Sequence, residues 1–141
     1  MTLERIIYYI KTIGEQHGQL KTIFYGNTWD FLDNGDNQYC AMMFNIDTGS
    51  VQGNMLVFNL DLFIIDRMLQ DMSNVEHVKS DCLQIGLDIL GKFKLNQEIR
   101  MSDSPSFEML EENTPDYLAG VKFTLQLFTP YVYDICNIPF K

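Results

Sequence analysis

Apolar residues recur at three- and four-residue steps between residues 73 and 94, which is the spacing of one face of an α-helix. Gly86 interrupts this face and indicates that another element packs closely there. Ser73 and Glu76 have the spacing of a capping box, so we expect the helix to begin at Ser73. The apolar face consists of Val75, Val78, Cys82, Ile85, Ile89 and Phe93, widened on one side by Leu83, Leu87 and Leu90.

A second helical pattern opens the chain. Thr2 is a suitable N-cap for it, and glycines bracket its end. His17 lies at the exit of this helix and His77 in the first turn of the later one. Neither has the spacing of a metal-ligand set, so we expect both to be exposed or to cap a helix. The apolar face of the first helix consists of Leu3, Ile6, Ile7, Ile10 and Ile13.

Alternation of apolar and polar residues predicts two consecutive strands, over residues 39–46 and 55–65. Residues 47–50 (DTGS) are expected to form the tight turn between them. The second strand is apolar on both faces near its ends, which favours a central place in the sheet. A short strand is expected over residues 20–25, followed by a turn-rich segment, 27–37, whose aromatic residues form a local cluster.

Two more strands are expected after the main helix. One begins with the alternation at Phe107 and Met109, and residues 113–116 (NTPD) then reverse the chain. Residues 120–128 show the clearest alternation in the sequence, which Pro130 ends. In this last strand we expect Val121, Phe123, Leu125 and Leu127 to point inward, and Lys122, Thr124 and Gln126 to point outward.

This order of elements predicts an α+β fold, with a mixed, largely antiparallel sheet and two helices packed on one of its faces. Residues 1–130 are expected to form one domain, since neither a linker nor an internal repeat interrupts them. Residues 131–141 are expected to form an apolar C-terminal arm. Such an arm either folds back on its own core or docks on a neighbouring protein.

The composition is that of a globular protein, with 46% hydrophobic residues among 141. Because no run approaches about 18 apolar residues, we expect no membrane span. The first twenty residues lack the pattern of a signal peptide. Cys40, Cys82 and Cys136 are odd in number and far apart, which favours buried free thiols in a reducing compartment over disulfides or a zinc site.

The net charge of −9 argues against sequence-independent DNA binding, because an acidic surface repels nucleic acid. The simplest interpretation of such a charge is that it keeps the protein soluble. The acidic residues are concentrated in residues 98–116, where Arg100 is the only basic residue. They are Glu98, Asp103, Glu108, Glu111, Glu112 and Asp116.

One triplet has the form of a catalytic motif. Asp47-Thr48-Gly49 is the signature of aspartic proteases, in which two such loops bring carboxylates together to share a proton. The apolar-Gly element that would complete the pattern, residues 89–91, lies inside the predicted helix, and the same triplet suits a hairpin turn. We therefore expect no catalytic residue, and we expect no cofactor or metal site.

Several segments across nearly the whole chain resemble one family of proteins in the order in which they occur. The family comprises the tail-terminator and tail-completion proteins of tailed bacteriophages, which form head–tail connector and tail rings. The likeness is to versions from phages of Bacteroidota, including the crAss-like phages. The similar segments are residues 2–7 (TLERII), 17–20 (HGQL), 59–66 (NLDLFIID), 78–90 (VKSDCLQIGLDIL), 117–121 (YLAGV) and 134–136 (DIC).

The resemblance implies a non-enzymatic virion structural protein, made in the bacterial host cytoplasm, that forms a ring of 12 or 6 copies. Its partners would be further copies of itself and neighbouring portal, connector or tail proteins. No association with a membrane is expected. Genomic DNA would pass through the ring without sequence-specific binding, which an acidic lining permits. Two sets of residues are expected to make the contacts: Glu108, Glu111, Glu112 and Asp116 at the lumen or ring edge, and Tyr131, Tyr133, Ile135, Ile138 and Phe140 in the arm.

Two functions of other classes remain as alternatives. One is a retroviral-type dimeric aspartic protease that uses Asp47-Thr48-Gly49. The other is a soluble α+β adaptor that binds a peptide along an edge of its sheet without forming a ring.

Overall fold

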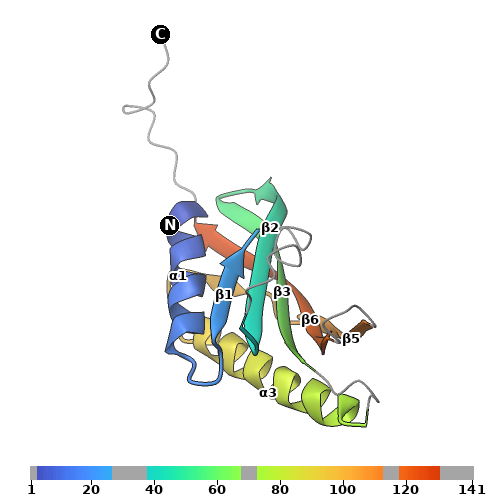
Figure 1. Cartoon of the computed structure of the whole chain (residues 1–141). Coiled ribbons are helices and arrows are strands. Elements are labelled where there is room, and N and C mark those ends of the chain that lie inside the picture. Colours follow the sequence, from blue (N-terminus) through green and yellow to red (C-terminus); the bar gives the residue numbers. More distant parts are fainter. Residues whose placement is uncertain (1–2, 27–37, 68–72, 113–117, 131–141) are drawn as a thin grey trace.

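The computed structural model describes residues 3–26, 38–67, 73–112 and 118–130. Within these ranges, helices α1 (Leu3–Gln16) and α3 (Val75–Lys94) lie against one face of a six-stranded sheet (Figure 1). The predicted α+β class is confirmed, as is the packing of both helices on the same face. The strands are β1 (Thr22–Tyr25), β2 (Ala41–Gln52), β3 (Met55–Arg67), β4 (Arg100–Met101), β5 (Ser106–Glu112) and β6 (Leu118–Pro130).

The sheet is antiparallel except for one pair of strands. Its order is β1-β2-β3-β6, and β4 and β5 both pair with the other side of β6. β1 runs parallel to β2, whereas all the other pairs are antiparallel. β3 pairs with β2 and β6 along almost its whole length, which confirms the central place expected from its apolar ends. The short strand β4 was not expected from the sequence.

The main core lies between the sheet and the two helices. The predicted stripe of α3 is buried from Val78 to Phe93, with Val75 half-buried at its start. The three leucines that widen this stripe differ in burial more than expected. Leu90 is buried, Leu83 is half-buried and Leu87 is 47% exposed. From the sheet, the core receives Met42, Phe44, Leu60, Leu62, Ile64, Val121, Phe123, Leu125 and Leu127, and from α1 it receives Ile6, Ile10 and Ile13.

The start of α3 differs from the prediction. The N-cap residue is Asn74, and its side chain makes no capping hydrogen bond, although its carbonyl accepts the N–H of Val78 at 3.0 Å. The helix therefore begins one residue later than the capping box predicted from Ser73 and Glu76 requires. Glu76 instead lies 3.7 Å from the Nζ of Lys79, one turn further along the helix.

The close approach predicted at Gly86 is confirmed. A Cβ atom at this position would overlap the ring of Phe123, which is buried on β6 directly beneath α3. Glycine thus lets the helix backbone lie against an aromatic ring, at a cost of about 1 kcal/mol in helix propensity relative to alanine. This contact sets the distance between α3 and the sheet at the middle of the helix.

The turn predicted at residues 47–50 is wrong. These residues belong to β2, and the chain reverses at Gly53, which has φ +59°, and Asn54, between the paired residues Gln52 and Met55. Asp47 is the extra residue of a β-bulge, because the register of β2 against β3 shifts between Ile46 and Thr48. A Cβ at Gly49 would lie 2.6 Å from the carbonyl oxygen of Val57, so close strand packing and not a turn requires this glycine.

The opposite face of the sheet has no helix among the described residues. At one end it carries a small apolar cluster of Ala41, Met43, Ile65 and Leu118. Further along, a row of polar side chains crosses three strands. Asn59 Nδ2 donates to Thr48 Oγ1 at 2.7 Å, and Gln126 Nε2 donates to Asn59 Oδ1 at 3.1 Å. The outward placement of Gln126 is as predicted.

Some predictions lie outside the described residues. They concern the turn-rich segment 27–37, the reversal at residues 113–116 and the arm at residues 131–141. In the part of the chain that is described, neither α1 nor α3 combines the length and apolar character that crossing a membrane requires.

Candidate interaction surface

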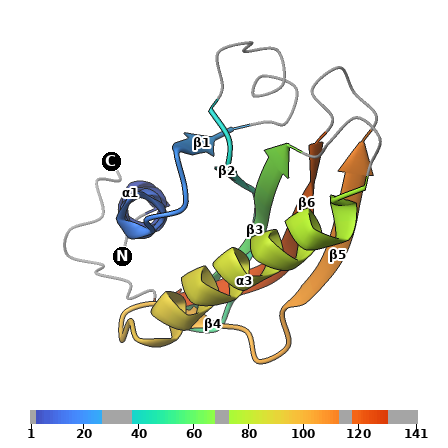
Figure 2. The ribbon, with the colours of Figure 1, turned by 60° about the horizontal axis from the view of Figure 1, so that its bottom comes forward.

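Exposed apolar residues lie at the edge of the sheet that β5 forms. This strand pairs with β6 from Ser106–Thr124 to Glu112–Leu118, and the described residues provide no strand on its other side. Figure 2 shows β5 beyond β6, at the edge remote from α1. A free edge of seven residues presents unpaired backbone N–H and C=O groups, which another strand could bind.

Two apolar side chains of β5 are exposed on the helix-facing side. Phe107 and Met109 pair in register with Phe123 and Val121, whose side chains lie in the main core. Directly paired residues point to the same face of a sheet, so all four lie on the side that the helices cover. Phe107 is nevertheless 51% exposed and Met109 42% exposed. The core face of the sheet therefore extends one strand beyond the helix that should cover it.

α3 contributes to this surface from above. On one flank of the helix, the carbonyl of Lys92 accepts a hydrogen bond from Tyr9 of α1, and Asp88 contacts His17 just after α1. Leu83 and Leu87 lie on the other flank, towards β5. The ring of Phe123 joins the two elements, because Gly86 packs on it from α3 and the Phe107 ring lies 5.9 Å from it, centroid to centroid. We call Leu83, Leu87, Phe107 and Met109 the apolar flank.

The predicted acidic stretch runs along this same edge of the sheet. It is not the loop we expected, since β4 and β5 together hold nine of its residues, 100–101 and 106–112. Glu98, Asp103 and Glu108 are exposed, and Glu108 lies on the helix-free face because it pairs in register with Lys122. Glu111 and Glu112 occupy the last two positions of β5.

The remaining predicted contact residues cannot be placed in the fold. Asp116 and the arm residues Tyr131, Tyr133, Ile135, Ile138 and Phe140 lie outside the described residues. The last described residue before the arm is Pro130, at the end of β6, where it pairs with Met55.

The aspartic-protease motif occupies a different part of the sheet. Asp47 is exposed at the bulge of β2, and Thr48 and Gly49 continue the strand. Residues 89–91 lie within α3, as expected from the sequence. The triplet therefore does not form the hairpin turn, nor the free loop in which such an enzyme holds its carboxylate.

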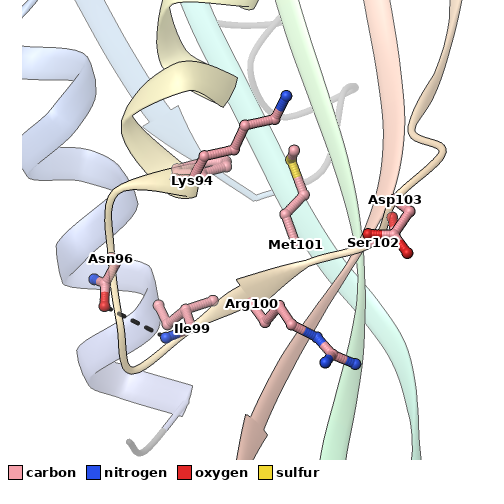
Figure 3. Close-up of a pocket in the computed structure, with 8 residues that line it drawn as sticks. Lys94, Asn96, Ile99, Arg100, Met101, Ser102 and Asp103 are labelled. Carbon is pink, nitrogen blue, oxygen red and sulfur yellow. Dashed lines mark hydrogen bonds between the residues drawn. The ribbon is translucent and has the colours of Figure 1, made fainter.

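A hollow of about 290 Å3 opens beside the C-terminal end of α3, where two basic residues suggest an anion site. Figure 3 shows that the side chains of Lys94 and Arg100 extend in different directions and do not converge. The Arg100 guanidinium instead lies over the Phe128 ring, 5.4 Å from its centroid. Asn96 Oδ1 is also occupied, since it accepts the backbone N–H of Glu98 at 2.7 Å.

The thiols of the described chain are buried and free. Cys40 and Cys82 form no disulfide, as expected, whereas Cys136 lies outside the described residues. A hydrogen bond with the Cys40 side chain, together with burial, raises the pKa of the Cys82 thiol far above its ordinary value. The thiolate is the reactive form, so the raised pKa makes the Cys82 thiol a poor nucleophile at neutral pH. Among the described residues, no three His, Cys, Asp or Glu side chains gather to hold a metal ion.

A further polar contact connects the exit of α1 to α3. His17 Nδ1 accepts the backbone N–H of Gln19 at 3.2 Å, so Nε2 carries the proton that is donated to Asp88 Oδ2 at 3.0 Å. This hydrogen bond from His17, with a further one from Gln84, lowers the pKa of Asp88. His17 thus links the exit of α1 to α3, whereas His77 pairs with Asp81 of its own helix, at 3.3 Å.

Asp88→Asn is expected to lower the free energy of unfolding at pH 7 by up to about 1 kcal/mol, a small effect because the carboxylate is half exposed. A lowered carboxyl pKa contributes stability above the ordinary value, about 3.9, and that contribution is lost as the pH falls through the folded value. The difference from the unchanged protein should therefore shrink as the pH falls below that ordinary value. Thermal unfolding at pH 7 and pH 2 measures it. Asp81→Asn, at an exposed pair, is the control and should change little at either pH.

No protein-family model matches the chain, and no curated protein matches it. Function must therefore be inferred from the geometry described above and from the resemblance noted in the sequence. The sequence pattern did not reveal the apolar flank, because alternation shows which face a residue points to but not whether a helix covers it. The sequence feature that could have indicated the apolar flank is the presence of two large apolar residues, Phe107 and Met109, in an otherwise acidic stretch.

Proposed function

We propose that this protein is a non-enzymatic structural subunit of a tailed-phage virion, which associates with further copies into a ring at the head–tail connector or tail. The observation that carries the proposal is the free β5 edge with the apolar flank beside it. An isolated subunit gains nothing from leaving Phe107, Met109 and Leu87 in water. A subunit that packs against a neighbour buries them on assembly.

The charge distribution suits a ring through which DNA passes. The chain carries nineteen acidic and ten basic residues, and exposed acidic side chains follow the same edge at Glu98, Asp103 and Glu108. A negative lining would repel the phosphate backbone and so prevent DNA from sticking during passage. The ring of 12 or 6 copies and the portal, connector or tail neighbours follow from the family resemblance.

The peptide-binding adaptor is supported by the same observation. An extended peptide could add to the free edge of β5 by main-chain hydrogen bonds, with its side chains resting on the apolar flank. The two functions differ in the occupant of the edge, which is another copy in the ring and a foreign peptide in the adaptor. The protease alternative has no comparable support, since Asp47 lies in a bulged strand.

Particle composition distinguishes these functions. Quantitative mass spectrometry of purified virions is expected to find the chain at 6 or 12 copies per particle. Met109→Asp places a charge in the apolar flank, on a side chain that is already 42% exposed, and should reduce the incorporated amount at least tenfold. Val51→Asp is the matched control, because Val51 is 59% exposed on β2, away from this edge, and incorporation should be unchanged.

Virions that lack the chain would contradict the structural role and leave the adaptor as the better interpretation. Equal incorporation of the two variants would instead show that the apolar flank is not the surface used in assembly.

A further inference from the structure

Resting on the proposed self-association, we infer that the occupant of the β5 edge is residues 132–138 of a neighbouring copy, added as an antiparallel strand. The apolar flank would then be covered by an arm from the next subunit. Three independent features point to this occupant: its length, its pattern of side chains, and the position of Pro130, after which the arm begins.

The length matches the available edge. Pro130 and Pro139 bracket residues 131–138, which contain no other proline and no glycine. Proline cannot donate to a strand ladder, so these two residues limit the stretch that can pair. β5 offers seven positions, Ser106–Glu112, and residues 132–138 supply seven. The segment is also rich in tyrosine, valine and isoleucine, which favour strands.

The alternation of side chains in the arm matches the two faces of β5. Tyr133 and Ile135 alternate with Asp134 and Cys136, so a strand would place the two kinds on opposite sides. With the apolar pair on the helix-facing side, Tyr133 and Ile135 would rest on the apolar flank. Asp134 and Cys136 would then point to the helix-free side, where Glu108 of β5 is exposed.

The charges select the direction of pairing. Full antiparallel overlap puts Ile135 opposite Met109, Cys136 opposite Glu108 and Asp134 opposite Leu110. Parallel overlap with the same faces would put Asp134 opposite Glu108. Like charges directly across a strand pair are destabilising, which disfavours the parallel arrangement.

The geometry of β6 selects a neighbouring copy over the chain's own edge. β6 ends at Pro130, whereas β5 begins opposite Thr124, six residues back along the same strand. At about 3.3 Å per residue, the arm would have to travel back roughly 20 Å, past β4, before it reached its own β5. That return would use about six residues and leave too few to cover the strand. An arm from an adjacent subunit has no such restriction.

Disulfide trapping between two different chains tests the inference. One chain carries Glu108→Cys, Cys136→Ser and an affinity tag, and the other is unchanged, so a mixed product requires pairing between copies. The two are mixed at high concentration and oxidised with copper–phenanthroline. Because a disulfide needs Cβ atoms about 3.5–4.5 Å apart, only facing residues join efficiently. The remaining described cysteines, Cys40 and Cys82, are buried and do not compete.

We expect the mixed product from Glu108→Cys to exceed that from Met109→Cys in the same background at least tenfold, since Met109 points to the opposite face. No excess over Met109→Cys, or a product from Leu110→Cys alone, would overturn the antiparallel arm. Particle composition tests the proposed function separately. Virions that contain the chain, combined with no trapped product, would overturn the arm while leaving the structural role in place.

Discussion

Gly86→Ala is expected to destabilise the protein by about 2 kcal/mol, although alanine is the better helix former. A Cβ at this position overlaps the ring of Phe123, which is 1% exposed and cannot move away without disturbing the core beneath α3. Overpacking of this kind costs about 1–3 kcal/mol or more, and outweighs the gain of about 1 kcal/mol in helix propensity. Chemical denaturation followed by circular dichroism measures the difference.

Gly91→Ala is the matched control for this prediction. Gly91 lies in the same helix and is exposed, and a Cβ added there would meet no atom within 4 Å outside the helix's own backbone. Only helix propensity changes there, so the protein should gain about 0.5–1 kcal/mol. In the Gly86→Ala background, Phe123→Leu should restore part of the loss, because a smaller side chain makes room for the methyl group. Two glycine variants of equal stability would contradict the close contact.

Much of the fold could be predicted because burial follows periodicity. Val78 to Phe93 on α3 and Val121 to Leu127 on β6 are buried where the 3.6- and two-residue patterns place them. The role of Gly86 was also predictable, since a glycine in the middle of an apolar helix face is costly unless something packs against it. These features depend on local sequence and on one face of one element.

The errors arose where several elements compete for the same residues. Asp-Thr-Gly suits a turn locally, but the two-residue turn at Gly53-Asn54 closes the hairpin with a better register, and β2 absorbs Asp47 as a bulge. The parallel pairing of β1 with β2 depends on how residues 26–40 connect them, which no periodicity reveals. The exposure of Phe107 depends on how far α3 covers the sheet in the direction of β5. The candidate site was therefore only partly predictable, since its acidic residues were found and its apolar flank was not.

A chain that ends at Pro130 is expected to fold with a nearly unchanged melting temperature and to fail completely to enter particles. The described residues form a continuous core from Ile6 on α1 to Leu127 on β6, and β6 runs from Leu118 to Pro130. If residues 131–141 instead packed on their own core, losing several large apolar side chains would cost several kcal/mol, at about 25 cal/mol per Å2 of apolar surface. Thermal unfolding and quantitative mass spectrometry of virions distinguish the two outcomes.

A full-length variant tests whether the arm acts through its apolar side chains or only through its length. Tyr133→Ser with Ile135→Ser removes the two side chains that we place on the apolar flank of a neighbour, and it should abolish incorporation as the truncation does. Lys141→Ser is the control and should assemble normally, because Lys141 lies outside residues 132–138 and is not a large apolar residue. The ordering cost of an arm that binds a neighbour is met by burial on assembly, so the isolated protein loses no stability with it. A truncated chain that still enters particles in normal amounts would exclude the arm from assembly.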